Sequence, residues 1–265
     1  MIKRLLFLIL VKPTILFCQV NTGPRLTGLA NASVAMQDVW SMQSNQAGIL
    51  QSKKPIISAA YLQNYASTDV ATKSAVMAVP FMDRNAAGVS FQSFGFSAYK
   101  EQKIGLCYAR SFGGKLNMAL NFNYHQLSIS SYGNESTYSV DAGLQYFIND
   151  DLIIGSHVSN LSKSGYSKFG SFIPTVFELG VAWRTAGKVL LSAEVMKTLD
   201  SSADVRAGLE YALADWFSLR GGISANPFMQ YAGFGFDYHG FRLDSAVSSH
   251  PDLGYLPQIG LTYAF

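Results

Sequence analysis

The chain consists largely of short alternating segments, and this pattern constrains its fold more than any other feature. From about residue 56 onward, apolar and polar residues alternate over roughly ten residues before a turn, the period and length of strands that cross a membrane in a β-barrel. An even number of segments lets both ends of a closed barrel lie on the same side. We therefore predict an all-β fold, a transmembrane antiparallel β-barrel of about fourteen strands formed by residues 56–265. The predicted strands are 56–62, 74–81, 85–94, 103–111, 115–126, 137–147, 151–159, 174–184, 187–197, 204–212, 215–223, 230–238, 240–248 and 256–265.

The connections between these segments are predicted to alternate in length. Tight turns follow the even segments, as at Asn149-Asp150, and longer polar loops follow the odd ones. The longer loops include 63–73, 128–136, 160–173 and 249–255. Short turns on one side and long loops on the other are typical of outer-membrane barrels, whose turns lie in the periplasm.

Composition agrees with a membrane barrel and excludes a nucleic-acid partner. Charged residues make up 14% of the chain and aromatic residues 13%, whereas soluble domains are about one quarter charged. Residues 1–18 hold three of the 20 basic residues and none of the 17 acidic ones, so the remaining chain carries no net charge. Only Cys107 remains after residue 18, which excludes an internal disulfide and a thiolate metal cluster.

The N-terminus predicts export. Met1 to Arg4 is a basic region, and the apolar run from Leu5 to Val11 is too short to cross a bilayer. We interpret residues 1–18 as a signal peptide cleaved after Cys18, which would deliver the chain to the outer membrane. The alternative is a lipoprotein acylated on Cys18, but the bulky Phe17 before it fits that processing poorly.

Outward-facing aromatic residues fall at the end of each even segment. Amphipathic rings favour the membrane interface, so these positions predict a periplasmic girdle in contact with outer-membrane lipid. The girdle residues are Phe81, Tyr108, Tyr146, Trp183, Tyr211 and Tyr238, with Tyr263 in the last segment.

The opposite face of each strand should line the lumen. Charged residues of both signs occupy it, which favours a network of ion pairs over a selectivity filter of one sign. The predicted network comprises Glu178, Glu194, Arg206, Glu210, Arg220, Asp237, Arg242 and Asp244. Glycines at inward positions leave room for an occupant, and we expect residues 19–55 to fill it. These glycines are Gly88, Gly105, Gly143, Gly155, Gly180, Gly208, Gly235 and Gly260.

The C-terminal stretch resembles the signal by which outer-membrane barrels are delivered to their insertion machinery. Gln258 and Gly260 are followed by Tyr263 and by the terminal Phe265. We expect this stretch to bind the insertion machinery and then to pair with residues 56–62, closing the barrel.

The region before the barrel resembles the N-terminal motif of the PorV/PorQ family, which is related to the FadL group of fatty-acid channels. The residues that carry the resemblance are Gly23, Arg25, Gly28, Asp38, Asn45, Ala47 and Gly48. Pro24, Leu29 and Gln46 depart from the family pattern. The resemblance implies fourteen strands and a hatch formed by residues 19–55.

The family implies two functions, of which we favour the secretion-associated one, because short strands and modest loops leave little extracellular surface for capturing a large ligand. PorV-like proteins act in type IX secretion, where they tether or shuttle secreted substrates at the outer membrane, and we expect secretion components or their substrates as partners. FadL-like proteins pass hydrophobic small molecules through the barrel wall, which requires an apolar path and a lateral gap. A barrel with a purely structural role is the third possibility.

The sequence shows no catalytic motif. His125, His157, His239 and His250 lack the spacing of metal ligands, and no nucleophile elbow or phosphate loop is present. We therefore predict no enzymatic activity, no catalytic or metal-binding residues and no cofactor.

Overall fold

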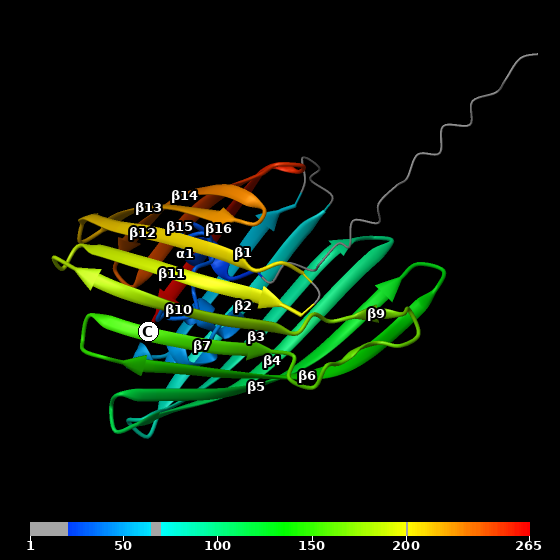
Figure 1. Ribbon diagram of the computed structural model, residues 1–265, viewed down its shortest axis with the longest axis horizontal. Helices are drawn as coiled ribbons and strands as arrows, with labels where there is room; N and C mark the ends of the chain where they lie inside the picture. The colour runs from blue at the N-terminus through cyan, green and yellow to red at the C-terminus, as the bar shows by residue number, and fades with distance from the viewer. Residues whose placement is uncertain (1–20, 65–69, 200) are drawn as a thin grey trace, which may run out of the picture.

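The computed structural model describes residues 21–64, 70–199 and 201–265, and these form a closed antiparallel barrel (Figure 1). The prediction of fourteen barrel strands is confirmed in the described residues. They are β1 (Ile56–Gln63), β2 (Ala71–Phe81), β3 (Asn85–Phe96), β4 (Tyr99–Phe112), β5 (Leu116–Ile129), β6 (Gly133–Phe147), β7 (Leu152–Ser159), β10 (Val176–Thr185), β11 (Val189–Thr198), β12 (Asp204–Ala214), β13 (Phe217–Ala225), β14 (Phe228–Tyr238), β15 (Phe241–His250) and β16 (Gly254–Ala264). Within these ranges, no helix is long and apolar enough to cross a membrane.

Pairing runs around the whole barrel without a break between neighbouring strands. Each strand pairs with the strands before and after it, and β7 pairs directly with β10. The last strand closes on the first, with a register that runs from Ile56 opposite Ala264 to Leu62 opposite Gln258. Between β6 and β7 the pairing covers Ala142 to Phe147, and residues 133–141 of β6 extend beyond β7.

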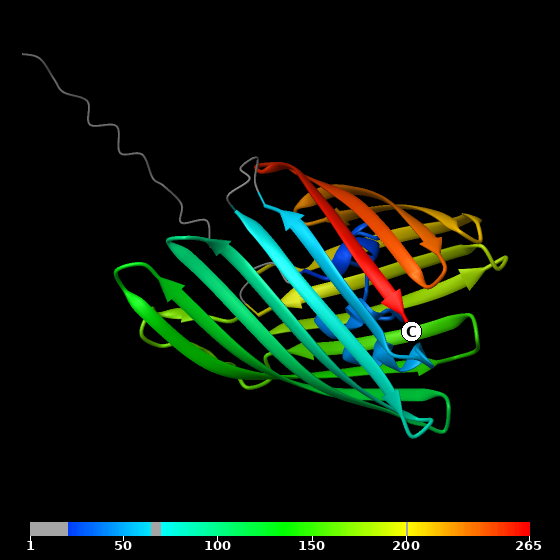
Figure 2. The same cartoon turned by 180° about the vertical axis from the view of Figure 1, so that it is seen from behind.

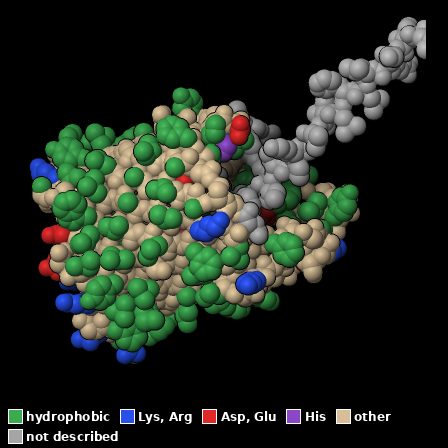
Figure 3. All heavy atoms as spheres, in the orientation of Figure 1, with side chains coloured by type: hydrophobic (Ala, Val, Ile, Leu, Met, Phe, Trp, Pro, Cys, Tyr) green, Lys and Arg blue, Asp and Glu red, His purple; other side chains and the backbone are tan. Residues whose placement is uncertain are grey.

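The alternation of side chains explains why these segments become the wall of a barrel. Along β12, Val205 and Leu209 point outward and are exposed, whereas Asp204 and Gly208 point inward and are buried. The same period of two continues through the other strands and turns an apolar face outward. Figure 3 shows this outer face, where charged side chains gather mainly at one end.

The predicted alternation of turns and long loops is wrong at four connections. Two residues join β3 to β4 and β13 to β14, and three residues join β5 to β6 and β15 to β16. The predicted loop 128–136 is a turn between Ile129 and Gly133, and the predicted loop 249–255 is a turn between His250 and Gly254. The polar residues there continue the strand pairing, because Ser131 (φ 68°) and Gly254 (φ 75°) reverse the chain in the left-handed region. A long connection does follow β7, and it contains the small hairpin of β8 (Gly165–Tyr166) and β9 (Ser171–Phe172).

The N-terminal segment, residues 21–55, lies inside the barrel (Figures 1 and 2). It contains α1 (Gly23–Thr27) and two short 3-10 helices, η1 (Val39–Gln43) and η2 (Gln46–Gln51). The expected signal peptide, residues 1–18, and the first two residues of the expected hatch, 19–55, lie outside the described residues.

Inward-facing glycines allow the N-terminal segment to approach the wall closely. A Cβ at Gly208 would stand 2.6 Å from the carbonyl oxygen of Leu29, and one at Gly155 would overlap the carbonyl of Val34. Any larger residue at these positions would displace the backbone of the segment. Of the other predicted inward glycines, Gly88, Gly143, Gly180 and Gly260 also face the segment, whereas Gly105 and Gly235 face side chains of the wall.

Candidate functional site

A cluster of five charged side chains connects the N-terminal segment to one side of the wall. The guanidinium of Arg25, on α1, donates to both carboxylate oxygens of Glu210 on β12, at 2.9 and 2.7 Å, and to Asp38 at 2.7 Å. Glu210 also accepts from Arg220 at 2.6 Å, and Arg220 donates to Asp244 at 2.7 Å. The two arginines and three carboxylates form one continuous chain of ion pairs, which we call the ionic latch.

Local structure positions the two members of the ionic latch that belong to the N-terminal segment. Asp38 precedes η1 and caps it, because its carboxylate accepts the N–H of Trp40 at 2.9 Å. Burial alone would lower the pKa of Arg25, but the carboxylates of Glu210 and Asp38 outweigh it and hold that pKa well above its ordinary value. Arg25 is therefore a permanent cation paired with two carboxylates.

Further along the same side, the wall binds the backbone of the segment directly. One carboxylate oxygen of Glu194, on β11, accepts the N–H groups of Ser33 and Val34 at 2.7 and 2.8 Å. Arg206 on β12 lies 3.5 Å from the other oxygen of Glu194 and 2.8 Å from Asp204. This side of the wall therefore binds the segment through charged side chains.

Asn45 ties the segment to the neighbouring part of the wall. Its side-chain amide donates to the carbonyls of Val34 and of Leu144 on β6, at 2.6 and 2.9 Å. Its side-chain oxygen accepts the N–H of Ala47 and so caps η2. Gln145 on β6 adds a hydrogen bond to the carbonyl of Met36 at 2.8 Å.

The opposite side of the segment packs against β1 to β5 through apolar contacts. Trp40, Met42 and Ile49 are buried there. The facing wall residues are small, namely Ala60, Val76, Ala78, Ala86, Cys107, Ala109 and Ala119. We call this contact the apolar seam. It is held by dispersion and the hydrophobic effect, which have no preferred direction.

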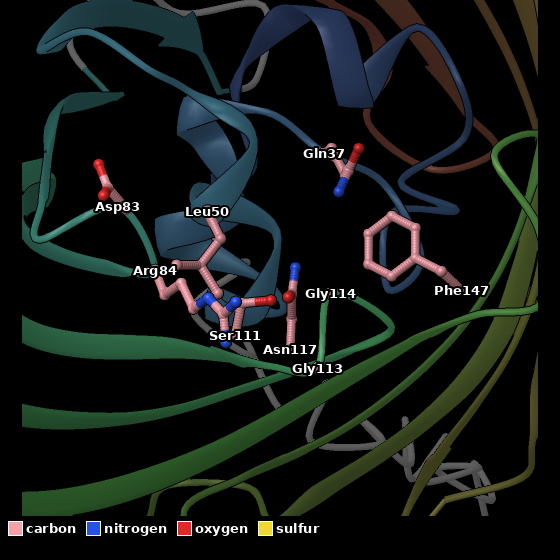
Figure 4. A pocket seen from close by; sticks show the side chains of 9 residues that line it. All are labelled: Gln37, Leu50, Asp83, Arg84, Ser111, Gly113, Gly114, Asn117 and Phe147. Carbon is pink, nitrogen blue, oxygen red and sulfur yellow. The ribbon is translucent and has the colours of Figure 1, made fainter.

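A cavity of about 430 Å³ lies beside the apolar seam, at the barrel end that carries the C-terminus and the turns after β2 and β4 (Figure 4). Leu50 and Gln37 line it from the N-terminal segment, and Arg84, Asn117 and Phe147 line it from the wall and its turns. Figure 4 shows Gln37 and Phe147 on the side of the space opposite Arg84. The tight turns and the aromatic girdle predict that this end of the barrel lies in the periplasm.

The structure places all eight residues of the predicted lumenal network on the inward face, where seven form ion pairs and Glu178 contacts His157. Glu194, Arg206, Glu210, Arg220 and Asp244 take part in the contacts to the segment described above. Glu178 pairs with His157 at 2.7 Å, and Asp237 pairs with Arg242 at 2.7 Å. No pairing role was predicted for His157 or Asp204. Alternation shows that both side chains face inward, but it does not show which side chains meet across neighbouring strands.

The predicted motif residues of the N-terminal segment take structural positions. Arg25, Asp38 and Asn45 make the contacts above, and Ala47 is fully buried. A side chain at Gly23 would overlap Trp40, one at Gly48 would overlap the carbonyl of Met36, and one at Gly28 would come within 3.2 Å of Arg220.

The predicted girdle residues lie at the same end of the barrel as the two aromatic residues of the assembly signal, Tyr263 and Phe265. Phe81, Tyr108, Tyr146, Trp183, Tyr211 and Tyr238 are all exposed on the outer face. In the assembly signal, Tyr263 packs on Phe265 with ring centroids 4.9 Å apart, and Gln258 and Gly260 point inward toward Asn21 and Pro24. Among the described residues, no group of three or more His, Cys, Asp or Glu is placed to hold a metal ion.

Comparison with solved structures gives consistent matches over almost the whole chain. A FadL homologue of Pseudomonas aeruginosa matches with a TM-score of 0.67 and 12% identity, covering 92% of this chain and 98% of its own. The toluene transporter TodX of P. putida matches with a TM-score of 0.71 and 10% identity, covering 92% and 98%. The fold is that of an outer-membrane β-barrel.

A third structure of this kind is the monoaromatic hydrocarbon channel CymD, with a TM-score of 0.70 and 12% identity, covering 94% of this chain and 99% of its own. No protein-family model matches the sequence, and no curated protein matches it. At identities this low, the likeness establishes the architecture, and the function has to be argued from the residues.

Proposed function

We propose that this barrel is a channel for small hydrophobic molecules and that the solute passes along the apolar seam between the N-terminal segment and β1 to β5. The observation that carries the proposal is the unequal attachment of the segment. Charged side chains of β11 and β12 bind it directly. The contacts on β1 to β5 are mainly apolar and involve small wall residues, with one hydrogen bond from the N–H of Asn21 to Gln92 on β3. The solved structures of similar fold include a toluene transporter and a monoaromatic hydrocarbon channel.

The physical chemistry of the two attachments favours this route. Opening the ionic latch would leave buried charges without partners, which costs about 3–5 kcal/mol for one partner removed. Parting the apolar seam for an apolar solute replaces one set of dispersion contacts by another and exposes no polar group. Met42 adds a flexible side chain that can repack around a solute. The seam is therefore the easier side to open.

The proposed route would end in the cavity. It lies beside the seam, where Leu50 of the segment and Phe147 of the wall line it together with the polar residues Gln37, Asp83, Arg84, Ser111 and Asn117. A solute that leaves the seam would enter a space of about 430 Å³ at the end of the barrel assigned to the periplasm. Because the described strands are paired all round, the route runs through the lumen and not through the wall.

A reversible disulfide across the seam tests this proposal. The side chain of Met42 occupies the position that a Cβ at Gly88 would take, so Met42→Cys with Gly88→Cys, in a Cys107→Ser background, joins the segment to β3. The matched control is Met42→Cys alone in the same Cys107→Ser background, which carries the same change in the segment. With a single cysteine it cannot form the disulfide, so oxidation adds no bond between the segment and β3.

The measurement is toluene entry into proteoliposomes before and after reduction. We expect the oxidised seam disulfide to stop barrel-dependent entry and dithiothreitol to restore it, whereas entry through the single-cysteine control is the same in both states. Equal entry through the oxidised and reduced seam variant would refute the route. No entry through the wild-type barrel would refute the channel itself.

The role in type IX secretion remains a prediction from the N-terminal motif. In the structure, the motif residues Arg25, Asp38 and Asn45 bind the segment to the wall, so their spacing has a structural explanation that requires no secretion partner. A pull-down from native outer membrane tests that role. It predicts recovery of secretion components or of proteins with a C-terminal sorting domain.

A further inference from the structure

An apolar groove lies on the outer surface of the barrel where the last strand closes on the first. It has a volume of about 540 Å³ and is lined mainly by outward residues of β15, β16, β1, β2 and β3, with Ala60, Ser74 and Gly260 of the same strands also contributing. Figure 2 shows this part of the wall, with β16 in red beside β1 and β2 in blue and cyan. The groove faces the membrane and is separate from the lumenal contacts described above.

Two small residues create the groove. Ala59 on β1 and Ala75 on β2 are opposite each other in the strand register and form its floor. Larger outward side chains rise on both sides, with Leu261 of β16 next to Ala59 and Phe91 of β3 next to Ala75. The width and the apolar lining are suited to an extended hydrocarbon chain.

One cation stands at the extracellular edge of the groove. Lys73 follows Ala75 on the outward face of β2, is exposed, and forms no ion pair among the described residues. It lies eight residues from Phe81 of the periplasmic girdle, which at strand rise and barrel tilt is about 21 Å along the barrel axis. Because the apolar band of such barrels is about 25 Å tall, Lys73 lies at the level of the outer-leaflet headgroups.

We propose that this groove binds one lipid with a phosphate-bearing headgroup, its acyl chain lying over Ala59 and Ala75 and its phosphate paired with Lys73. Charge complementarity favours this occupant over a second copy of the chain. A two-fold contact through the groove would place the two Lys73 side chains close together at the same height in the membrane. Like charges so arranged repel, whereas a lipid phosphate is attracted.

The opposite wall supplies matched control positions. Ala193 on β11 and Ala207 on β12 are also paired opposite each other and exposed on the outer face. Lys197 is an exposed lysine on the outward face of β11. This second pair of alanines does not line the groove and has no lysine two residues away.

The test is native mass spectrometry of the detergent-solubilised barrel with added dipalmitoyl phosphatidic acid or, for comparison, dipalmitoylglycerol, which has the same acyl chains and no phosphate. We expect one tightly held phosphatidic acid per barrel. Ala75→Trp should abolish this adduct by filling the groove, and Lys73→Gln should weaken it about fivefold, the weight of one lysine at an anionic lipid surface. Ala207→Trp and Lys197→Gln should leave it unchanged.

Heat-modifiable migration checks that each variant is a folded barrel. Equal phosphatidic acid binding by wild type and Ala75→Trp would overturn the proposed site. Equal retention of the two lipids would overturn the role of the phosphate. A dimer that disappears in Ala75→Trp would show that the occupant is a second copy and would overturn the proposal in favour of that interface.

Discussion

Replacing Arg25 by methionine should release the N-terminal segment from the wall. The side chains of Arg25, Asp38 and Glu210 are 11%, 9% and 14% exposed, so their ion pairs are largely shielded from water. Removing one partner of a buried pair costs about 3–5 kcal/mol. Glu210 keeps Arg220 at 2.6 Å and Asp38 keeps the N–H of Trp40, so we expect the lower end, about 3 kcal/mol.

Amide hydrogen exchange of residues 21–55, followed by mass spectrometry, measures this release, because exchange of protected amides reports local opening. A loss of about 3 kcal/mol corresponds to roughly 100-fold faster exchange, at 1.4 kcal/mol for each factor of ten. Peptides from the wall strands should be unaffected. Arg25→Lys should give an intermediate result, because lysine keeps the charge but cannot donate to both oxygens of Glu210 in the same planar geometry.

The control is Arg242→Met. Arg242 pairs with Asp237, but their side chains are 36% and 35% exposed, and such pairs contribute about 0–1 kcal/mol. Exchange in the segment should then change by less than about fivefold. If Arg25→Met and Arg242→Met gave the same exchange rates, the reasoning that the ionic latch holds the segment would be refuted.

Three further predictions follow from the same contacts. Glu194→Gln should speed amide exchange at Ser33 and Val34 about 10- to 100-fold, because hydrogen bonds to a charged acceptor contribute about 1.5–3 kcal/mol. Exchange at the wild-type rate would contradict this. Glu135→Gln at the exposed rim is the control. Gly208→Ala should lower the thermal midpoint in detergent by about 2–10 °C through overpacking against Leu29. The control Gly221→Ala should leave the midpoint unchanged, because its Cβ would meet nothing closer than 3.9 Å. Equal midpoints would count against close packing of the segment. Phe265→Ala, which removes the ring packed on Tyr263, should reduce the heat-modifiable fraction in the outer membrane, and an undiminished fraction would argue against the assembly signal.

The face on which each side chain lies was more predictable from the sequence than the residues at which the strands end. The outward and inward faces follow from alternation alone, so Val205 and Glu210 were assigned to opposite faces from the sequence. The ends of β5 and β6 could not be assigned from the sequence, because Ser130 to Tyr132 contain polar residues that suit a loop or a turn equally well. The pairing of Ser128 with Asn134 decides between them, and that pairing depends on the register of the whole hairpin.

The residues of the candidate site were predictable from the sequence, but the contacts between them were not. Alternation identified Glu194, Glu210 and Arg220 as lumenal, and a family motif drew attention to Arg25. The sequence did not show that Arg25 binds Glu210, 185 positions away, or that Glu194 binds backbone and not a side chain. The apolar seam and the outer groove were also missed, because each depends on which small residues from several strands come to lie together.

By itself, the sequence determined a closed β-barrel with an apolar exterior, a charged lumen and small inward residues, because a period of two is a local property that every strand repeats. Only the tertiary structure decided that the N-terminal segment is bound by charges on one side and by apolar contacts on the other. The physical reason is that closure and register set which side chains meet across the lumen. Those distances arise from the barrel as a whole and are encoded in no single segment.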